Sequence, residues 1–532
     1  MQLSRKYKFQ LIEVGILFAV FILSLQLRKE NVSAPLSPEH EWITAHTLIT
    51  LEIWEENGGP AAYNFNPIYA YPGKGNRGIA MLGGVSDQEG YHYYVSYPPF
   101  SFIFAYYSSQ LFGGTDVYHL RAINLIIHFI TAFLIYLLIR GFYRNDFDRL
   151  ALAPLLVACM YLLSTGTLWA HSVLYFADIL VQPLILLIFL LFSRIIQQKV
   201  KNQSWMLFYL GITIFFAVYT EWIALFMAFF GGLFFFICYL KSRSKLYLKS
   251  FVTIALSASL SLGLTVFQYS TISGFDQFKQ VSSNKYEERS GHATAEKTAA
   301  AFNLENPEAF KLLRANVDRN FLMAENLLGI SFFLLLPFLF WRKSRNRIPP
   351  LSATLFILSL LLISILIHYL LFYNFNALHN FSNLKTGLFM MLTVGVIICI
   401  IEQSVNWKIQ GVFSLIVLFF FISRASRDID RYYGIYEKQF YNADRVRSAK
   451  LVHQYADKDL YIFNNIHPSP AYTYTAKHLT FPLAEKSHLL QSMHNFNIDK
   501  AQYYHHQGSV PLYFIYVEKL NDTLVVRDSL AF

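Results

Sequence analysis

Residues 355–367 read LFILSLLLISILI, a run without a single charged side chain. Three further runs have the same character: LLVACMYLL at 155–163, LILLIFLLF at 184–192 and LFFFICYL at 233–240. A helix that crosses a bilayer needs about 20 predominantly apolar residues, and each run lies within an apolar segment of that length or nearly so. We therefore predict an all-α protein that crosses a membrane several times.

The composition of the 532-residue chain agrees with this prediction. Hydrophobic residues make up 55% and charged residues 15%, against about 45–50% and about 25% in soluble domains. The net charge of +10 lies in short loops between apolar runs and not on one soluble face, which excludes a nucleic-acid partner. The cysteines Cys159, Cys238 and Cys399 lie within apolar runs, so no disulfide framework is expected.

Spans are expected at 9–27, 119–140, 150–164, 178–195, 205–219, 222–240, 250–270, 326–341, 351–373, 386–403 and 408–424. The first follows Arg5, Lys6 and Lys8 and lacks a small-residue cleavage site after it. We interpret it as a retained helix with a cytoplasmic amino end. Alternate loops then hold Lys and Arg, whereas 165–177, 220–221 and 374–384 hold none. This alternation is typical of a cell-membrane protein with basic loops in the cytoplasm.

One apolar segment, 97–112, does not fit as a span, because it would invert the pattern of basic loops for the rest of the chain. It begins YPPF, and we predict an interfacial helix on the outer side, with Pro98 and Pro99 in its first turn. Two loops, 28–118 and 271–325, and the tail then face outward. We divide the chain into a membrane domain, 1–424, and a small extracytoplasmic α/β domain, 425–532. In that domain we expect a helix at 445–456 and strands at 460–465, 478–481, 512–517 and 523–526.

Ionisable residues collect at the predicted outer ends of the spans. They are Glu39 and Glu41 after the first span, then His171, Asp178, Glu221, His379 and Lys385. Such groups at membrane depth are costly and therefore mark candidate functional sites. Each also has an ordinary structural interpretation. Asp178 suits a helix cap, Lys385 suits a side chain that reaches the interface, and Glu39 suits solvent.

The order of these features resembles the GT-C superfamily of polyprenyl-phosphate-sugar glycosyltransferases. The most similar branch contains lipid A aminoarabinose transferases and protein O-mannosyltransferases. Their acidic residue and amphipathic helix after the first span match PEHEWITAHTLITLEIWEENG at 38–58, and their Pro-Pro segment matches SYPPFSFIFAY at 96–106. Their Arg-initiated span matches RAINLIIHF at 121–129, and their second acidic loop matches HSVLYFADILV at 171–181. Thr220-Glu221 stands where the family has Thr-Lys, which puts a phosphate contact there in doubt.

The resemblance implies a membrane enzyme of the outer face of a bacterial inner membrane. It would move a hexose or pentose from a polyprenyl-phosphate donor to a lipid, glycan or protein acceptor, with inversion. By carry-over Glu41 is the general base, with Glu39 as the next candidate, and Asp178 orients the acceptor or holds a divalent cation. Lys385 and His379 are candidates to contact the phosphate, and Tyr97, Arg121, His171 and Glu221 are further substrate-binding candidates. The use of a metal stays open, as do the sugar and the acceptor.

Two other functions stay open from the residues. A transporter or flippase would place polar groups near the membrane midplane in repeated broken helices, and the ionisable groups here lie at span ends. A polysaccharide ligase or polymerase of another family would also combine many spans with large outer loops. A passive anchor for the tail does not explain so many spans.

Overall fold

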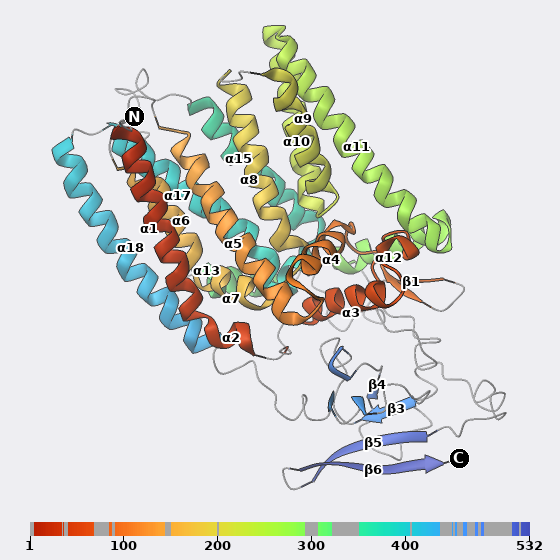
Figure 1. The fold of residues 1–532 in the computed structure, drawn as a ribbon. Helices are drawn as coiled ribbons and strands as arrows, with labels where there is room; N and C mark the ends of the chain where they lie inside the picture. The colour runs from red at the N-terminus through yellow and green to blue at the C-terminus, as the bar shows by residue number, and fades with distance from the viewer. Residues whose placement is uncertain are drawn as a thin grey trace.

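The computed structural model describes most of the membrane part of the chain and short pieces of the tail. The described residues are 5–34, 36, 41–68, 84–87, 91–143, 150–198, 202–292, 307–321, 351–404, 407–436, 449–450, 453–454, 461–464, 474–476, 480–482, 513–520 and 523–531. Long helices packed side by side dominate this part of the molecule (Figure 1). The prediction of a mostly helical membrane protein is therefore confirmed.

Seven helices in this described part are long and apolar enough to cross a membrane. They belong to α1 (Arg5–Leu27), α5 (Val117–Arg140), α8 (Ala177–Ile196), α10 (Trp222–Ser242), α11 (Lys245–Ser273), α15 (Leu351–Leu371) and α17 (Leu384–Ser404). A bent pair, α6 (Leu152–Leu163) and α7 (Thr165–Val173), passes the same test as one unit with an angle of 57° between its halves. The apolar helix α9 (Gln203–Val218) is shorter, and α18 (Trp407–Tyr436) follows α17.

Every expected span except 326–341, which lies outside the described residues, coincides with one of these helices. Two boundaries differ from the sequence prediction. The loop expected at 165–177 contains α7, because Ser164 breaks the helix and Thr165–Val173 resumes it at an angle. Helix α18 continues to Tyr436, so the expected domain boundary at 424 falls inside a continuous helix.

The segments predicted to face outward gather at one end of the bundle, which we call the site end. They form α2 (Lys29–Ser33), α3 (Trp42–Glu56), η1 (Pro60–Tyr63), β1 (Gly84–Ser86), β2 (His92–Tyr94), α4 (Phe100–Phe112), α12 (Phe275–Ser290) and α13 (Pro307–Phe321). In Figure 1 they lie at the lower end, where α3 runs across the bundle. Helix α4 follows Pro98-Pro99 and ends at Gly113, whose φ of +91° suits glycine. The loop between α15 and α17 adds α16 (Tyr373–Leu378) and η3 (Asn380–Asn383), which contact α12 and α13.

At the opposite end, two buried carboxylates from distant helices complete the start of α6. The main-chain N–H of Ala151 donates to Glu13 of α1 at 2.6 Å. Those of Leu152 and Ala153 each donate to Glu402 of α17 at 3.1 Å. The first N–H groups of a helix have no partner within the helix and favour negative charge. Helix α6 therefore acquires its cap from tertiary contacts.

The described parts of the tail form a four-stranded sheet with the strand order β4-β3-β5-β6. Strand β3 (Tyr461–Asn464) pairs in parallel with β4 (Thr480–Pro482) and with β5 (Tyr513–Leu520). Strand β6 (Thr523–Ala531) is antiparallel to β5. All four strands lie at the positions expected from the sequence. Most of the expected helix at 445–456 is outside the described residues, and the α/β domain as a unit stays a prediction.

Helix α17 packs closely against α5 and α6 at Gly395. A Cβ atom on this glycine would lie 3.0 Å from both Ile139 Cδ1 and Val157 Cγ2. We expect Gly395→Leu to destabilise the bundle by about 1–3 kcal/mol through overpacking. The matched control is Gly263→Leu on α11, because a Cβ there would meet nothing within 4 Å. Thermal unfolding in detergent should separate the two variants, and equal melting temperatures would contradict this packing.

Candidate functional site

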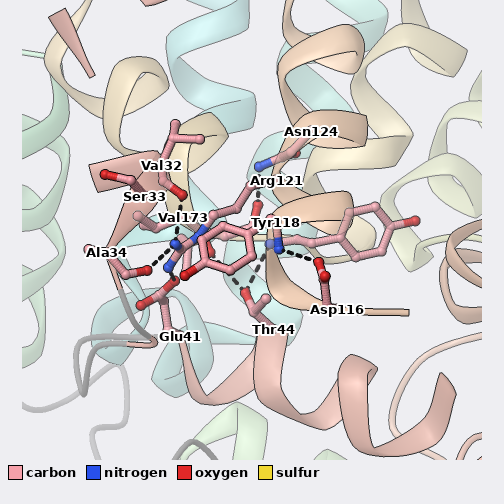
Figure 2. A network of polar contacts seen from close by, with 12 residues as sticks. Val32, Ser33, Ala34, Glu41, Thr44, Asp116, Tyr118, Arg121, Asn124 and Val173 are labelled. Atoms are coloured by element: carbon pink, nitrogen blue, oxygen red, sulfur yellow. Dashed lines mark hydrogen bonds and ion pairs between the residues drawn. The ribbon is translucent and has the colours of Figure 1, made fainter. Parts of the chain in front are cut away.

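One face of α5 carries polar side chains that hold the site end together. Arg121, Asn124 and His128 are spaced by three and four residues and are buried, so they lie on the same side of the helix. Arg121 Nη2 forms an ion pair with Glu41 Oε1 at 2.6 Å, and both side chains are almost completely buried. Its Nη1 donates to the carbonyl groups of Val32, at 3.0 Å, and Ala34 (Figure 2). A single guanidinium thus joins the end of α2 to the start of α3.

The neighbouring residues fix the segment that leads into α8. Asn124 Nδ2 donates to Ala170 O at 3.1 Å and also to Leu174 O. Thr44 of α3 donates to Val173 O and accepts from the main-chain N–H of Tyr175, each at 3.0 Å. Asn124 and Thr44 appear on either side of Arg121 in Figure 2. Because Asp178 lies in the first turn of α8, these bonds also determine where its carboxylate lies.

Asp178 is buried beside a tyrosine from the loop before α4. Tyr97 Oη lies 3.5 Å from Asp178 Oδ2, and the ring of Tyr97 packs edge-on against Phe176 with 4.8 Å between centroids. Burial, followed by the charge of Asp178, raises the pKa of Tyr97 well above its ordinary value. The Tyr97 hydroxyl therefore stays protonated and can donate a hydrogen bond across the neutral pH range.

Glu221 and Lys385 lie in the same group of charges, although the sequence separates them widely. Glu221 caps α10 by accepting the main-chain N–H of Ile223 at 2.7 Å, and its other oxygen lies 3.2 Å from His368 Nε2. Burial opposes ionisation of Glu221. The hydrogen bond from His368 and the charge of Lys385 outweigh burial, so the pKa of Glu221 is lowered. Glu221 thus acts as a fixed negative charge.

His368 lies between Glu221 and Lys385. Asn376 Nδ2 donates to Phe372 O at 2.7 Å and lies 3.2 Å from His368 Nδ1, which assigns Nδ1 as the acceptor and Nε2–H as the donor to Glu221. Lys385 Nζ lies 3.5 Å from His368 Nε2 and 5.8 Å from the centre of the Tyr369 ring. Lys385 is 7% exposed, so its charge depends on these neighbours and on the nearby carboxylates.

A second cation reaches this group from the outer loop. Arg289, at the end of α12, places its guanidinium 4.6 Å from the Tyr97 ring centre and 5.0 Å from that of Phe375. Its charge acts on Asp178. The C-terminal turn of α12 is fixed by Asn374 Nδ2, which donates to Glu288 O at 2.8 Å. Asp178, Glu221, Lys385 and Arg289 therefore form a group of two carboxylates and two cations.

Aromatic rings lie between this group and the Glu41–Arg121 pair. Trp42 contacts His379 at 5.8 Å between centroids, and His379 contacts Phe381 at 5.2 Å. The ring centroid of Phe381 lies 6.2 Å from that of Phe176, and Phe176 stands two residues before Asp178 in the chain. His379 is therefore placed among aromatic rings, in contact with the residue that follows Glu41.

The other predicted site residues are placed as follows. His171 is completely buried, with Nε2 at 2.9 Å from Tyr161 Oη and Nδ1 at 3.3 Å from Asn124 O. Glu39 lies outside the described residues. No group of three His, Cys, Asp or Glu side chains among the residues with described placement could hold a metal ion. Thus the structure brings together Tyr97, Asp178, Glu221 and Lys385, and it pairs Glu41 with Arg121.

Sequence reasoning missed His368 and Arg289. His368 ends the apolar run of α15, which contains no Asp, Glu, Lys or Arg. The rule that identified Lys385, an ionisable side chain at the end of a span, also applies to His368. Arg289 belongs to a polar outer helix with several other charges. Nothing in the sequence distinguishes it from its neighbours.

Solved structures of known proteins share the fold of this chain, although no known sequence family matches it. No protein-family model matches the sequence, and no curated protein does. Among solved structures, ArnT from Cupriavidus metallidurans bound to undecaprenyl phosphate is similar with a TM-score of 0.54 at 12% identity, over 96% of this chain and 93% of that chain. The Archaeoglobus fulgidus oligosaccharyltransferase in complex with Zn and sulfate is similar with a TM-score of 0.53 at 13% identity, over 94% and 68%.

A second structure of the archaeal enzyme, AglB in complex with an inhibitory peptide and a dolichol-phosphate, gives a TM-score of 0.52 at 12% identity. It covers 95% of this chain, which corresponds to 69% of AglB. Both kinds of neighbour are GT-C glycosyltransferases. At these identities the likeness concerns the fold, and it agrees with the resemblance seen in the sequence motifs. This chain is a membrane protein with the GT-C glycosyltransferase fold.

Proposed function

We propose that this protein is an integral-membrane glycosyltransferase that uses a polyprenyl-phosphate-linked sugar. The observation that carries the proposal is the group of Asp178, Tyr97, Lys385 and Arg289 at the site end of a GT-C fold. A carboxylate beside two cations suits a reaction in which an acceptor loses a proton and a phosphate leaves. The neighbours with bound undecaprenyl phosphate or dolichol-phosphate support this class of donor.

In the proposed reaction an acceptor hydroxyl attacks the anomeric carbon on the face opposite the phosphate. The new carbon–oxygen bond forms as the bond to the phosphate oxygen breaks, and the configuration inverts. The acceptor proton passes to a carboxylate, and polyprenyl phosphate leaves with its negative charge stabilised by Lys385 and Arg289. The isoprenoid tail stays in the lipid, which explains why the site lies at the ends of membrane helices.

Two carboxylates are candidates for the general base. Glu41, favoured by the sequence resemblance, is held by Arg121 at 2.6 Å and is completely buried, so its charge is already paired with a buried cation. Asp178 is linked to Tyr97 over the longer distance of 3.5 Å and stands within the group that holds both cations. We therefore propose Asp178 as the base and Glu41 as the residue that positions the α2–α3 segment through Arg121.

The first test is a donor screen with two variants. Membranes containing the protein receive radiolabelled undecaprenyl-phosphate sugars, and transfer of label to lipid, glycan and protein fractions is followed. Asp178→Asn keeps the shape of the side chain and should reduce turnover by about 10²–10⁴-fold without a change in melting temperature. Glu41→Gln leaves a buried guanidinium without its counter-charge, which should cost about 3–5 kcal/mol of stability.

Two results would contradict these assignments. Turnover lost in Glu41→Gln at an unchanged melting temperature would make Glu41 the base. No transfer by a well-folded wild-type protein, from any donor, would reject the glycosyltransferase and favour a transporter or flippase.

The two cations can be tested by binding of undecaprenyl phosphate. A hydrogen bond to a charged group contributes about 1.5–3 kcal/mol, so Lys385→Met and Arg289→Met should each weaken binding by roughly ten- to a hundredfold. Lys285→Met is the matched control, because Lys285 lies on the same helix as Arg289 and pairs with Glu288 at 2.7 Å. Affinities measured by tryptophan fluorescence should remain unchanged for the control. Equal affinities for all three variants would place the phosphate elsewhere.

We further propose that the site end faces the outside of a bacterial inner membrane. The proposal rests on the alternation of basic loops in the sequence and on Arg140, Arg194, Lys241 and Lys245, which the structure describes at the opposite helix ends. In a Cys238→Ala background, Gln110→Cys and Asp276→Cys should react with an impermeant maleimide in right-side-out vesicles. Ser242→Cys, at the opposite end, should react only after the membrane is permeabilised. The reverse pattern would show that the site faces the cytoplasm.

A further inference from the structure

A buried chain of polar side chains runs from the end of α1 to the first turn of α8. Arg28 Nη1 lies 2.9 Å from His128 Nδ1, and the rings of His128 and His171 stack at 4.2 Å with an interplanar angle of 9°. His171 Nε2 lies 2.9 Å from Tyr161 Oη, which donates to Gln182 Oε1 at 2.7 Å. All five side chains are at least 98% buried. None of them has a part in the proposed reaction.

The donor groups fix the direction of the hydrogen bonds at the two ends of this chain. The guanidinium of Arg28 can only donate, so His128 Nδ1 accepts and its Nε2–H points to Tyr161 O at 3.3 Å. Tyr161 has one proton, which goes to Gln182 Oε1. Tyr161 Oη can still accept a hydrogen bond from His171 Nε2 at 2.9 Å, and Asn124 O, which has two lone pairs, can accept one from Nδ1 at 3.3 Å.

The last bond of the chain reaches the residue that we assign as the base. Gln182 Nε2 donates to the main-chain carbonyl of Asp178 at 3.1 Å. The two amide ends of Gln182 are thus both engaged, one by Tyr161 of α6 and the other by Asp178. A glutamine without these partners could adopt several rotamers, and the first turn of α8 would lose a support on the side facing α6.

We infer that His171, Tyr161 and Gln182 are positioning residues that set the orientation of the first turn of α8 and thereby direct the Asp178 carboxylate. The inference rests on the proposed function of Asp178. The free energy of burial supports it. Burying the four uncharged polar side chains, those of His128, His171, Tyr161 and Gln182, is unfavourable in a membrane protein unless each is paired. Apolar residues of similar size would fill this space at a lower cost. It also gives His171 a role other than the substrate contact expected from the sequence.

The most selective variant is Tyr161→Phe, which removes only the hydroxyl between His171 and Gln182. Ser250→Ala is the matched control, because Ser250 is also buried but donates only within its own helix, to Leu246 O at 2.8 Å. Amide hydrogen exchange of the peptide at 174–183 is measured in detergent for both variants. Turnover and KM are measured with the donor that the screen identifies, and melting temperatures are recorded.

We expect faster exchange at 174–183 in Tyr161→Phe, with other helices unchanged. Turnover should fall by roughly ten- to a hundredfold, as for a small misplacement of a reacting group, while KM stays as in the wild type. Gln182→Leu should have the same effect. The double variant should be no worse than either single one, because both break the same chain. Ser250→Ala should match the wild type in every measurement.

Other results would overturn the inference. Unchanged exchange at 174–183 would show that the chain does not hold α8, whatever happens to turnover. Faster exchange spread over the whole bundle, with a lower melting temperature and normal turnover per folded molecule, would leave the chain with a role in stability alone. If the wild-type protein transfers no sugar, the proposed function fails by itself. Hydrogen exchange alone then decides whether the chain orders α8.

Discussion

The arrangement of the site end depends on the need to neutralise a guanidinium buried at the membrane boundary. Arg121 is 1% exposed, and the Coulomb attraction of one carboxylate repays its desolvation only if its other donors are also used. The protein meets this demand with Glu41 and with the carbonyl groups of Val32 and Ala34. The residues that satisfy the charge therefore come from two segments. Satisfying it forces the end of α2 and the start of α3 into one place on α5.

A second consequence of the same face of α5 is the fixed approach to α8. Asn124 donates hydrogen bonds to two carbonyl groups of the α7–α8 segment, and Thr44 forms hydrogen bonds with two further main-chain groups. The segment has no regular structure of its own at 174–176, so these bonds replace the helical ones that it lacks. The position of the Asp178 carboxylate is thus determined by hydrogen bonds from α5 and α3. Tyr97, Lys385 and Arg289 then approach it from three other segments.

The sequence was sufficient to predict the parts of this arrangement that follow from hydrophobicity and charge. The apolar runs located the long helices, and alternation of basic loops assigned Tyr97, Asp178, Glu221 and Lys385 to one end. It could not show which polar residues meet. Glu41 and Asp178 were expected to act on one substrate, but the pair with Arg121 depends on side-chain packing that no spacing encodes. The burial of His171 could not be predicted for the same reason, because a histidine near a span end has the same pattern whether it points inward or outward.

The cap of α6 has a consequence for how the chain is assembled. Its first N–H groups rely on Glu402, which lies 249 positions beyond Ala153 in the sequence. During synthesis α6 therefore leaves the ribosome and enters the membrane long before this partner exists. Until α17 arrives, the amino end of α6 must find water or lipid headgroups as partners, since bare N–H groups in hydrocarbon are costly. Assembly of the bundle is thus completed late, when Glu402 of α17 replaces water or headgroups as the hydrogen-bond partner of the first N–H groups of α6.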